Sequence, residues 1–172
     1  MTSQASAAVA SADREFMVTR SFNAPRDLVW KAWSEPERLA QWWGPKGCKL
    51  EVRKLEFKPG GIFHYGMQMG PGMWWGRFTY REIEKPVRIV FVSSFSDEAG
   101  GITRAPFSST WPLEVLNNLT LTEENGKTTV TLRGGPINAT PEERAFYEGM
   151  FESMQQGFGG TFDQLDEYLA KA

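Results

Sequence analysis

The C-terminal part of the chain carries an apolar stripe that is long enough to cross a whole β-sheet. Thr140, Pro141 and Glu143 form the pattern of a helix start, with an N-cap, a first-turn proline and a capping-box glutamate. After them an apolar residue recurs every three or four positions, at Phe146, Met150, Met154, Phe158, Phe162, Leu165 and Leu169. This spacing predicts one helix of about 30 residues, roughly 45 Å long at about 1.5 Å per residue.

The middle of the chain alternates apolar and polar residues in short runs, as antiparallel strands do. The alternation predicts strands at 48–57, 62–69, 74–84, 87–95, 111–122 and 127–133, with a loop at 97–110 and a hairpin turn at Asn125-Gly126. Gly134-Gly135-Pro136 is expected to end the last strand. Upstream, we expect a strand at 15–22 and two short helices. The first helix starts at Pro25 and ends near Trp33, and the second opens with a Ser34–Glu37 capping box and extends to Trp43.

This order of elements predicts an α+β fold in a single domain over residues 15–172. A curved antiparallel sheet of six to seven strands would wrap around the long C-terminal helix, with the two short helices after the first strand closing one end. Residues 1–14 are rich in Ala and Ser without periodicity, and they predict a disordered N-terminal tail.

Charge and composition exclude several classes of function. The 19 basic and 21 acidic residues leave a net charge of −2, so nucleic acid is not expected as a partner. No polybasic segment and no run of 18 apolar residues is present, so we expect no membrane association. The single cysteine, Cys48, fits a cytoplasmic protein, and with the single histidine, His64, it is too few for a Cys/His zinc site. No nucleotide-binding glycine motif is present, and we expect neither cofactor nor metal, although these counts leave a carboxylate-bound metal open.

The 12 Phe, 7 Trp and 7 Met are suited either to line a cavity that binds an apolar ligand or to fill an ordinary, tightly packed core. Strand alternation turns His64 outward to solvent and places an aromatic set on the inner face. Asn117 is a polar residue on an apolar face, where it would either bind a ligand or be a satisfied core amide. The predicted lining, to which the long helix contributes its methionines and Phe158, is Phe63, Tyr65, Met67, Trp74, Phe78, Tyr80, Phe91, Asn117, Met150, Met154 and Phe158.

Several segments together resemble a known family. They are Phe22–Trp33, Pro36–Pro45, Pro59–Gly61, Tyr80–Ile83, Phe95–Glu98 and Met154–Leu165. In this order they resemble the bacterial branch of the family named for homology to the activator of the 90-kDa heat-shock chaperone ATPase. That family belongs to the START-like, or SRPBCC, superfamily, whose members are often called polyketide cyclase-like. The resemblance implies a helix-grip fold with an internal cavity, and Phe158 stands where the family commonly has Trp.

Three functions remain open at this stage. The first is binding of a small, largely apolar molecule between the sheet and the long helix. The second is a cofactor-independent cyclase, dehydratase or hydrolase, with Tyr65, Tyr80, Asn117 or an inward Arg77 as candidate groups. The third, which the resemblance implies, is a stress-related module that contacts a chaperone. A homodimer is also left open.

Overall fold

A computed structural model describes residues 15–172 and confirms the predicted α+β class. The segment predicted as a tail, 1–14, lies outside the described residues. Eight strands form one antiparallel sheet in the order β1-β8-β7-β5-β4-β3-β2, with β6 pairing only with β5. The strands are β1 (Phe16–Phe22), β2 (Lys49–Leu55), β3 (Ile62–Met69), β4 (Gly72–Glu84), β5 (Arg88–Ser96), β6 (Ile102–Thr103), β7 (Glu114–Glu124) and β8 (Lys127–Ile137).

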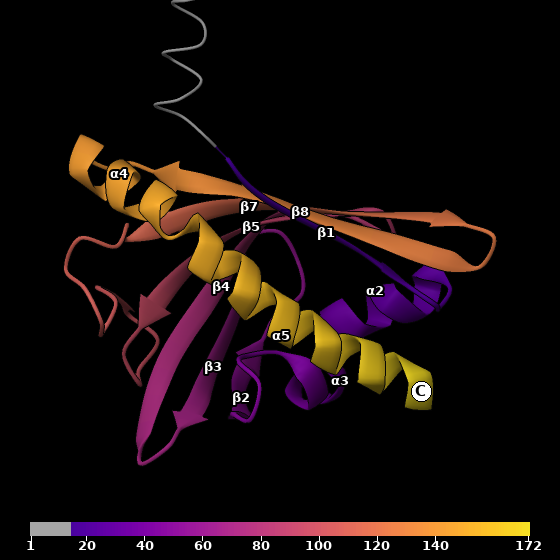
Figure 1. The fold of residues 1–172 in the computed structure, drawn as a ribbon. Coiled ribbons are helices and arrows are strands. Elements are labelled where there is room, and N and C mark those ends of the chain that lie inside the picture. Colours follow the sequence, from indigo (N-terminus) through magenta and orange to yellow (C-terminus); the bar gives the residue numbers. More distant parts are fainter. Residues whose placement is uncertain (1–14) are drawn as a thin grey trace, which may run out of the picture.

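The helices lie on one face of this curved sheet. They are α2 (Arg26–Ser34), α3 (Pro36–Trp42), α4 (Pro141–Gly149) and α5 (Phe151–Lys171). Figure 1 shows α5 running diagonally across the sheet, with α2 and α3 beside its C-terminal half. The arrangement is the helix-grip fold, in which the strands curl around one long helix and short helices close one end.

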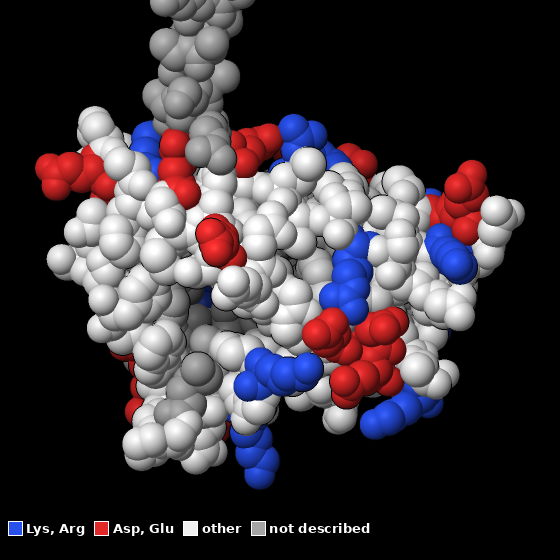
Figure 2. Space-filling view, viewed as in Figure 1, with Lys and Arg blue, Asp and Glu red and all other residues white. Residues whose placement is uncertain are grey.

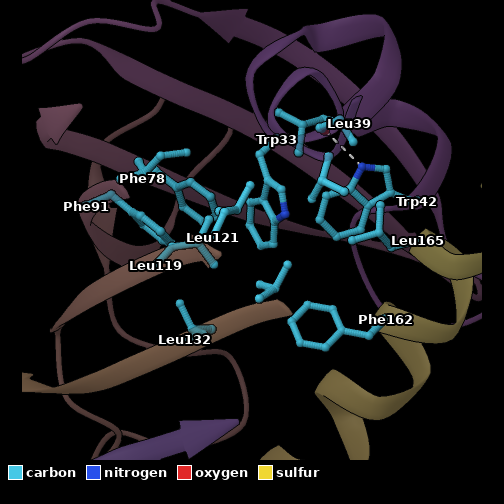
Figure 3. Packing of buried hydrophobic residues seen from close by; sticks show 14 of the residues in the cluster. Trp33, Leu39, Trp42, Phe78, Phe91, Leu119, Leu121, Leu132, Phe162 and Leu165 are labelled. Carbon is cyan, nitrogen blue, oxygen red and sulfur yellow. Dashed lines mark hydrogen bonds between the residues drawn. The ribbon is translucent and has the colours of Figure 1, made fainter. Parts of the chain in front are cut away.

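One part of the buried core lies where α2, α3 and α5 meet the sheet. Figure 3 shows Trp33 between the sheet residues Phe78 and Leu121 and the helical residues Leu39 and Trp42. The ring centroids of Trp33 and Trp42 are 4.7 Å apart, and the indole N–H of Trp42 donates to the backbone oxygen of Ala32 at 3.0 Å. Burying this donor with a partner lets a large ring enter the core without leaving a polar group unpaired.

The predicted 30-residue helix is wrong in one respect, because it is divided into α4 and α5 at Met150. Met150 has φ −98° and ψ 4°, and its N–H donates to Tyr147 O at 3.1 Å, so the regular helical pattern is broken there. Gly149 directly precedes the break, and glycine is a poor helix former. The predicted start at Thr140 is confirmed, since Thr140 and Glu143 form both hydrogen bonds of a capping box.

The capping box predicted at Ser34 and Glu37 is also wrong. Ser34 is the last residue of α2, and its hydroxyl donates to the Trp30 backbone oxygen at 2.8 Å. The N-cap of α3 is Glu35, which has extended backbone angles and no side-chain cap. A residue before proline is disfavoured in the helical region, so Pro36 forces Glu35 out of the helix and moves the start by one residue.

The strand ends differ from the prediction around two segments. β8 continues through Gly134-Gly135-Pro136 to Ile137, which pairs with Glu114 of β7. Pro136 is tolerated because β1 pairs with β8 from Phe22–Thr128 to Phe16–Gly134, so the proline lies beyond that ladder, where a missing N–H costs little. The predicted loop 97–110 contains β6, and β7 begins at Glu114 instead of residue 111.

Within residues 15–172, no helix has the combination of length and apolar character that crossing a bilayer requires.

Candidate functional site

A pocket of about 180 Å³ lies between the inner face of the sheet and the helices α4 and α5. Its wall combines inward-facing residues of β1, β3, β4, β5, β7 and β8 with Trp43, which follows α3, and Trp111, which precedes β7. The wall residues are Phe16, Trp43, Tyr65, Met67, Gly76, Phe78, Phe91, Ser93, Ser94, Phe95, Trp111, Val115, Asn117, Leu132, Tyr147, Met154 and Phe158.

A second hollow of about 240 Å³ adjoins this pocket on the side of Gly44, Pro45 and Gly157. The two share Trp43, Tyr65, Met67, Met154 and Phe158 as wall residues. Figure 2 shows a hollow in the surface beside the first turns of α5, over β3 and β4, with basic side chains beside it and mostly uncharged surface elsewhere around it. The second hollow therefore serves as the outer part of the site.

Aromatic rings dominate the inner wall. Phe78 stacks on Phe91 with ring centroids 4.3 Å apart and meets the edge of Trp43 at 5.3 Å. Phe158 of α5 stacks on Phe16 of β1 at 5.6 Å, which connects the helix to the far side of the sheet. Among the described residues that form the wall, none is Asp, Glu, His, Lys or Arg. A wall of this kind favours an apolar occupant.

Gly76 makes room for the Tyr65 ring on the neighbouring strand. The two residues are paired in the β3–β4 ladder, and a Cβ at position 76 would lie 2.6 Å from the Tyr65 hydroxyl oxygen. Burial raises the pKa of Tyr65 to about 12, against a smaller opposing effect of the Trp43 indole N–H. The phenol is therefore neutral at physiological pH.

One end of the pocket is polar. Asn117 is buried on β7, and its Nδ2 donates to Ser93 Oγ at 3.0 Å and to the Val115 backbone oxygen at 3.1 Å. Both amide hydrogens are thus used, as in a core amide, while the Oδ1 atom of Asn117 accepts no hydrogen bond from the described residues. Tyr147 of α4 is buried on the same wall. Burial, and to a smaller extent the Glu15 carboxylate, raises the pKa of the Tyr147 phenol.

The structure brings seven of the predicted lining residues onto the pocket wall and places four elsewhere. Phe63 lies in the core against the rings of Tyr65 and Phe78, and Tyr80 meets Phe57 at 5.0 Å. Trp74 stacks on Phe107 with ring centroids 6.2 Å apart, and Met150 is at the break between α4 and α5. The seven on the wall are Tyr65, Met67, Phe78, Phe91, Asn117, Met154 and Phe158.

Ten wall residues are absent from the predicted lining. Three of them, Trp43, Trp111 and Tyr147, lie outside the observed strands, and seven are strand residues: Phe16, Gly76, Ser93, Ser94, Phe95, Val115 and Leu132. Trp43 follows α3 outside any predicted strand, so no periodicity indicates its direction. Trp111 begins the predicted strand 111–122 in phase with Val115 and Asn117, so alternation did indicate the inner face, but the predicted lining did not include it. Tyr147 is buried whereas its neighbour Phe146, assigned to the apolar stripe, is half-buried. The break at Met150 shifts the phase of α4 relative to α5, so a stripe extended backwards from α5 selects the wrong residue.

His64 and Arg77 also depart from expectation. His64 is on the outer face, as alternation predicts, but it is buried instead of facing solvent. The segment 97–101 folds back over it, so that its Nε2 lies 3.2 Å from Asp97 O. Arg77 is opposite His64 on that outer face and donates to Gly100 O at 2.7 Å. An inward Arg77, one of the catalytic candidates, is therefore wrong.

Within the described part of the chain, no group of three His, Cys, Asp or Glu side chains is arranged to hold a metal ion.

The fold and the pocket can now be compared with known proteins. The family model described as activator of Hsp90 ATPase homolog 1-like protein matches residues 23–170. The chain belongs to this family. A comparison with curated proteins finds no match. The family assignment agrees with the resemblance of segments from Phe22 to Leu165.

Solved structures show the same fold. A protein from Arthrobacter aurescens, solved by NMR, is 25% identical with a TM-score of 0.76, covering 92% of this chain and 87% of its own. Ms6760 from Mycobacterium smegmatis is 23% identical with a TM-score of 0.73, covering 91% of both chains. CalU16 from Micromonospora echinospora is 18% identical with a TM-score of 0.59, covering 91% of this chain and 76% of its own. The latter two likenesses concern the fold alone.

Proposed function

We propose that this member of the Hsp90 ATPase activator homolog-like family binds a small, largely apolar molecule between its sheet and α5. The observation that carries the proposal is the uncharged aromatic wall around unfilled space. An apolar cavity of about 150 Å³ is sufficient to take up benzene. The inner pocket of about 180 Å³ and the adjoining hollow of about 240 Å³ together offer room for a ligand of one or two fused rings.

The chemistry of the wall favours binding over acid–base catalysis. A general base needs a pKa near the working pH. Burial raises the pKa of the Tyr65 and Tyr147 phenols further above neutral pH. The amide of Asn117 does not titrate. Tyr80, a further candidate, lies against Phe57, and Arg77 lies on the opposite face of the sheet. These placements support a carrier or receptor role.

Thermal unfolding with a library of apolar ring compounds tests the proposal. A ligand at about 100 times its Kd adds roughly 2.7 kcal/mol, which for a chain of this size raises Tm by roughly 5–10 °C. Native mass spectrometry of the same mixtures provides a second readout. If no compound raises Tm and none is retained in the mass spectrum, the proposal is wrong.

A pair of matched variants locates the binding. Val115→Phe places a ring into the inner pocket, because Val115 is on its wall. Thr122→Phe adds the same ring on the exposed outer side of the same strand. We expect the first variant to lose the ligand-induced rise in Tm and the second to keep it. Loss in both variants, or in neither, would contradict binding in this pocket.

A further inference from the structure

The polar end of the pocket contains two oxygen atoms that converge on one point. A Cβ built on Gly134 of β8 would lie 2.9 Å from Asn117 Oδ1 and 3.4 Å from the Tyr147 hydroxyl oxygen. The two side chains come from β7 and α4, so the sheet and the helix layer meet here. Asn117 is 8% exposed and Tyr147 is 1% exposed, and both residues are on the pocket wall, so the surface that they keep faces the pocket.

A count of hydrogen bonds shows what this end of the pocket offers. The two amide hydrogens of Asn117 go to Ser93 Oγ and Val115 O, which leaves Oδ1 as an acceptor. The Tyr147 hydroxyl forms no hydrogen bond with the described residues and is a donor with its proton in place. Neither oxygen is among the fully enclosed side-chain atoms that lack a partner, so both remain accessible on the pocket wall. One ligand group that both donates and accepts a hydrogen bond satisfies the acceptor and the donor together.

Electrostatics excludes an anionic partner at this end. Arg104, between β6 and β7, forms an ion pair with Glu143 at 2.6 Å and donates to Trp111 O at 3.2 Å, and the described wall of the pocket contains no Lys or Arg. The Glu15 carboxylate acts on the Tyr147 phenol and disfavours negative charge there. A ligand carboxylate that moved from water into the polar end of the pocket would lose its hydration without finding a cationic partner there.

We infer that the ligand is a neutral ring compound bearing a hydroxyl group, which donates to Asn117 Oδ1 and accepts from the Tyr147 hydroxyl. The inference rests on the proposed function and specifies its ligand class. Phenols, enols and alcohols on an apolar ring belong to this class. Fatty acids and other carboxylates do not, and a plain hydrocarbon fills the pocket but leaves both oxygen atoms unsatisfied.

Three compounds of one ring system test the inference: naphthalene, 2-naphthol and 2-naphthoate. Calorimetric titration at about pH 7 compares them, since the phenol is then neutral and the carboxylate ionised. We expect 2-naphthol to bind about tenfold more tightly than naphthalene, because each net hydrogen bond contributes a factor of a few. We expect 2-naphthoate to bind at least about tenfold more weakly than 2-naphthol.

Variants assign the preference to the two oxygen atoms. In Asn117→Leu the advantage of 2-naphthol over naphthalene should fall to about threefold or less, and Tyr147→Phe should reduce it by removing only the hydroxyl. Tyr168→Phe on α5 is the matched control, because its hydroxyl contacts Arg38 away from the pocket. The Tyr147 variant remains informative even if Asn117→Leu does not fold.

The outcomes separate the two proposals. If none of the three compounds binds the unmodified chain, the proposed function fails. If naphthalene and 2-naphthol bind equally, or 2-naphthoate binds as tightly as 2-naphthol, the pocket binds apolar rings and the hydroxyl inference is wrong. The inference is also wrong if Tyr147→Phe keeps the full preference, or if Tyr168→Phe reduces it to the same extent.

Discussion

Truncating two neighbouring rings of α5 should have very different costs. Phe162 is fully buried, with ring centroids 5.8 Å from Phe22, 6.4 Å from Trp33 and 5.8 Å from Phe158. Replacing it with alanine removes a ring from a filled core, which costs about 3–5 kcal/mol. Phe158 is half-buried and borders both hollows. Its removal enlarges space that is already empty.

The expected loss for Phe158→Ala follows from area alone. Fully burying a phenylalanine is worth about 1.5–3 kcal/mol, so a half-buried ring contributes about 1–1.5 kcal/mol. We therefore expect Phe162→Ala to destabilise the chain by roughly 2–3 kcal/mol more than Phe158→Ala. Urea unfolding followed by far-UV circular dichroism measures both free energies, provided that the m-values agree.

The comparison has a clear refuting result. If the two variants lose the same free energy within about 0.5 kcal/mol, Phe158 is packed as tightly as Phe162. The same conclusion follows if Phe158→Ala is the more destabilised variant. Either result would mean that α5 and the sheet meet without a hollow.

Three further changes test the local geometry. Burial raises the pKa of Tyr65 to about 12, above the value near 10 of an exposed phenol. The stability that the neutral buried phenol contributes is therefore present below about pH 10 and is lost as the pH rises to about 12, a loss on the order of a few kcal/mol. Urea unfolding across this range checks it, and Tyr65→Phe should show a smaller loss; an equal loss would contradict the shift. Gly76→Ala should destabilise the chain by about 1–3 kcal/mol, because its Cβ would lie 2.6 Å from the Tyr65 hydroxyl oxygen. Gly135→Ala is the control, since its Cβ meets no atom within 4 Å. Equal melting temperatures of the two variants would refute the close approach at Gly76. Thr140→Ala should lower the free energy of unfolding in urea by about 1 kcal/mol, because it breaks the capping box, whereas Thr140→Ser keeps the cap. Equal free energies of unfolding for the two variants would contradict the cap.

The fold was predictable because the local signals agree with the packing. Alternation in the strands and the apolar spacing after Thr140 predicted the α+β class and a C-terminal helix packed on the sheet. The predicted helix boundaries are wrong where a single residue restricts the backbone in a way that apolar spacing does not reveal. Pro36 moves the start of α3, and the break after Gly149 divides the long helix.

The pocket was predictable only where regular strands contribute to it. Alternation places Tyr65, Phe78 and Phe91 on the inner face, and the structure has them on the pocket wall. Trp43 and Tyr147 depend on the path of the chain after α3 and on the phase of a short helix, which are set by tertiary contacts. A chaperone contact and a homodimer stay predictions.

Xenon binding tests the central claim most directly, because xenon enters apolar cavities without needing a specific chemical group. We predict that a crystal of the chain under xenon pressure shows xenon inside the inner pocket, against the wall residues Phe91, Val115 and Met154. Val115→Phe should remove that xenon peak. A crystal in which α5 packs directly on the sheet at this pocket, with no xenon between them, would contradict the claim.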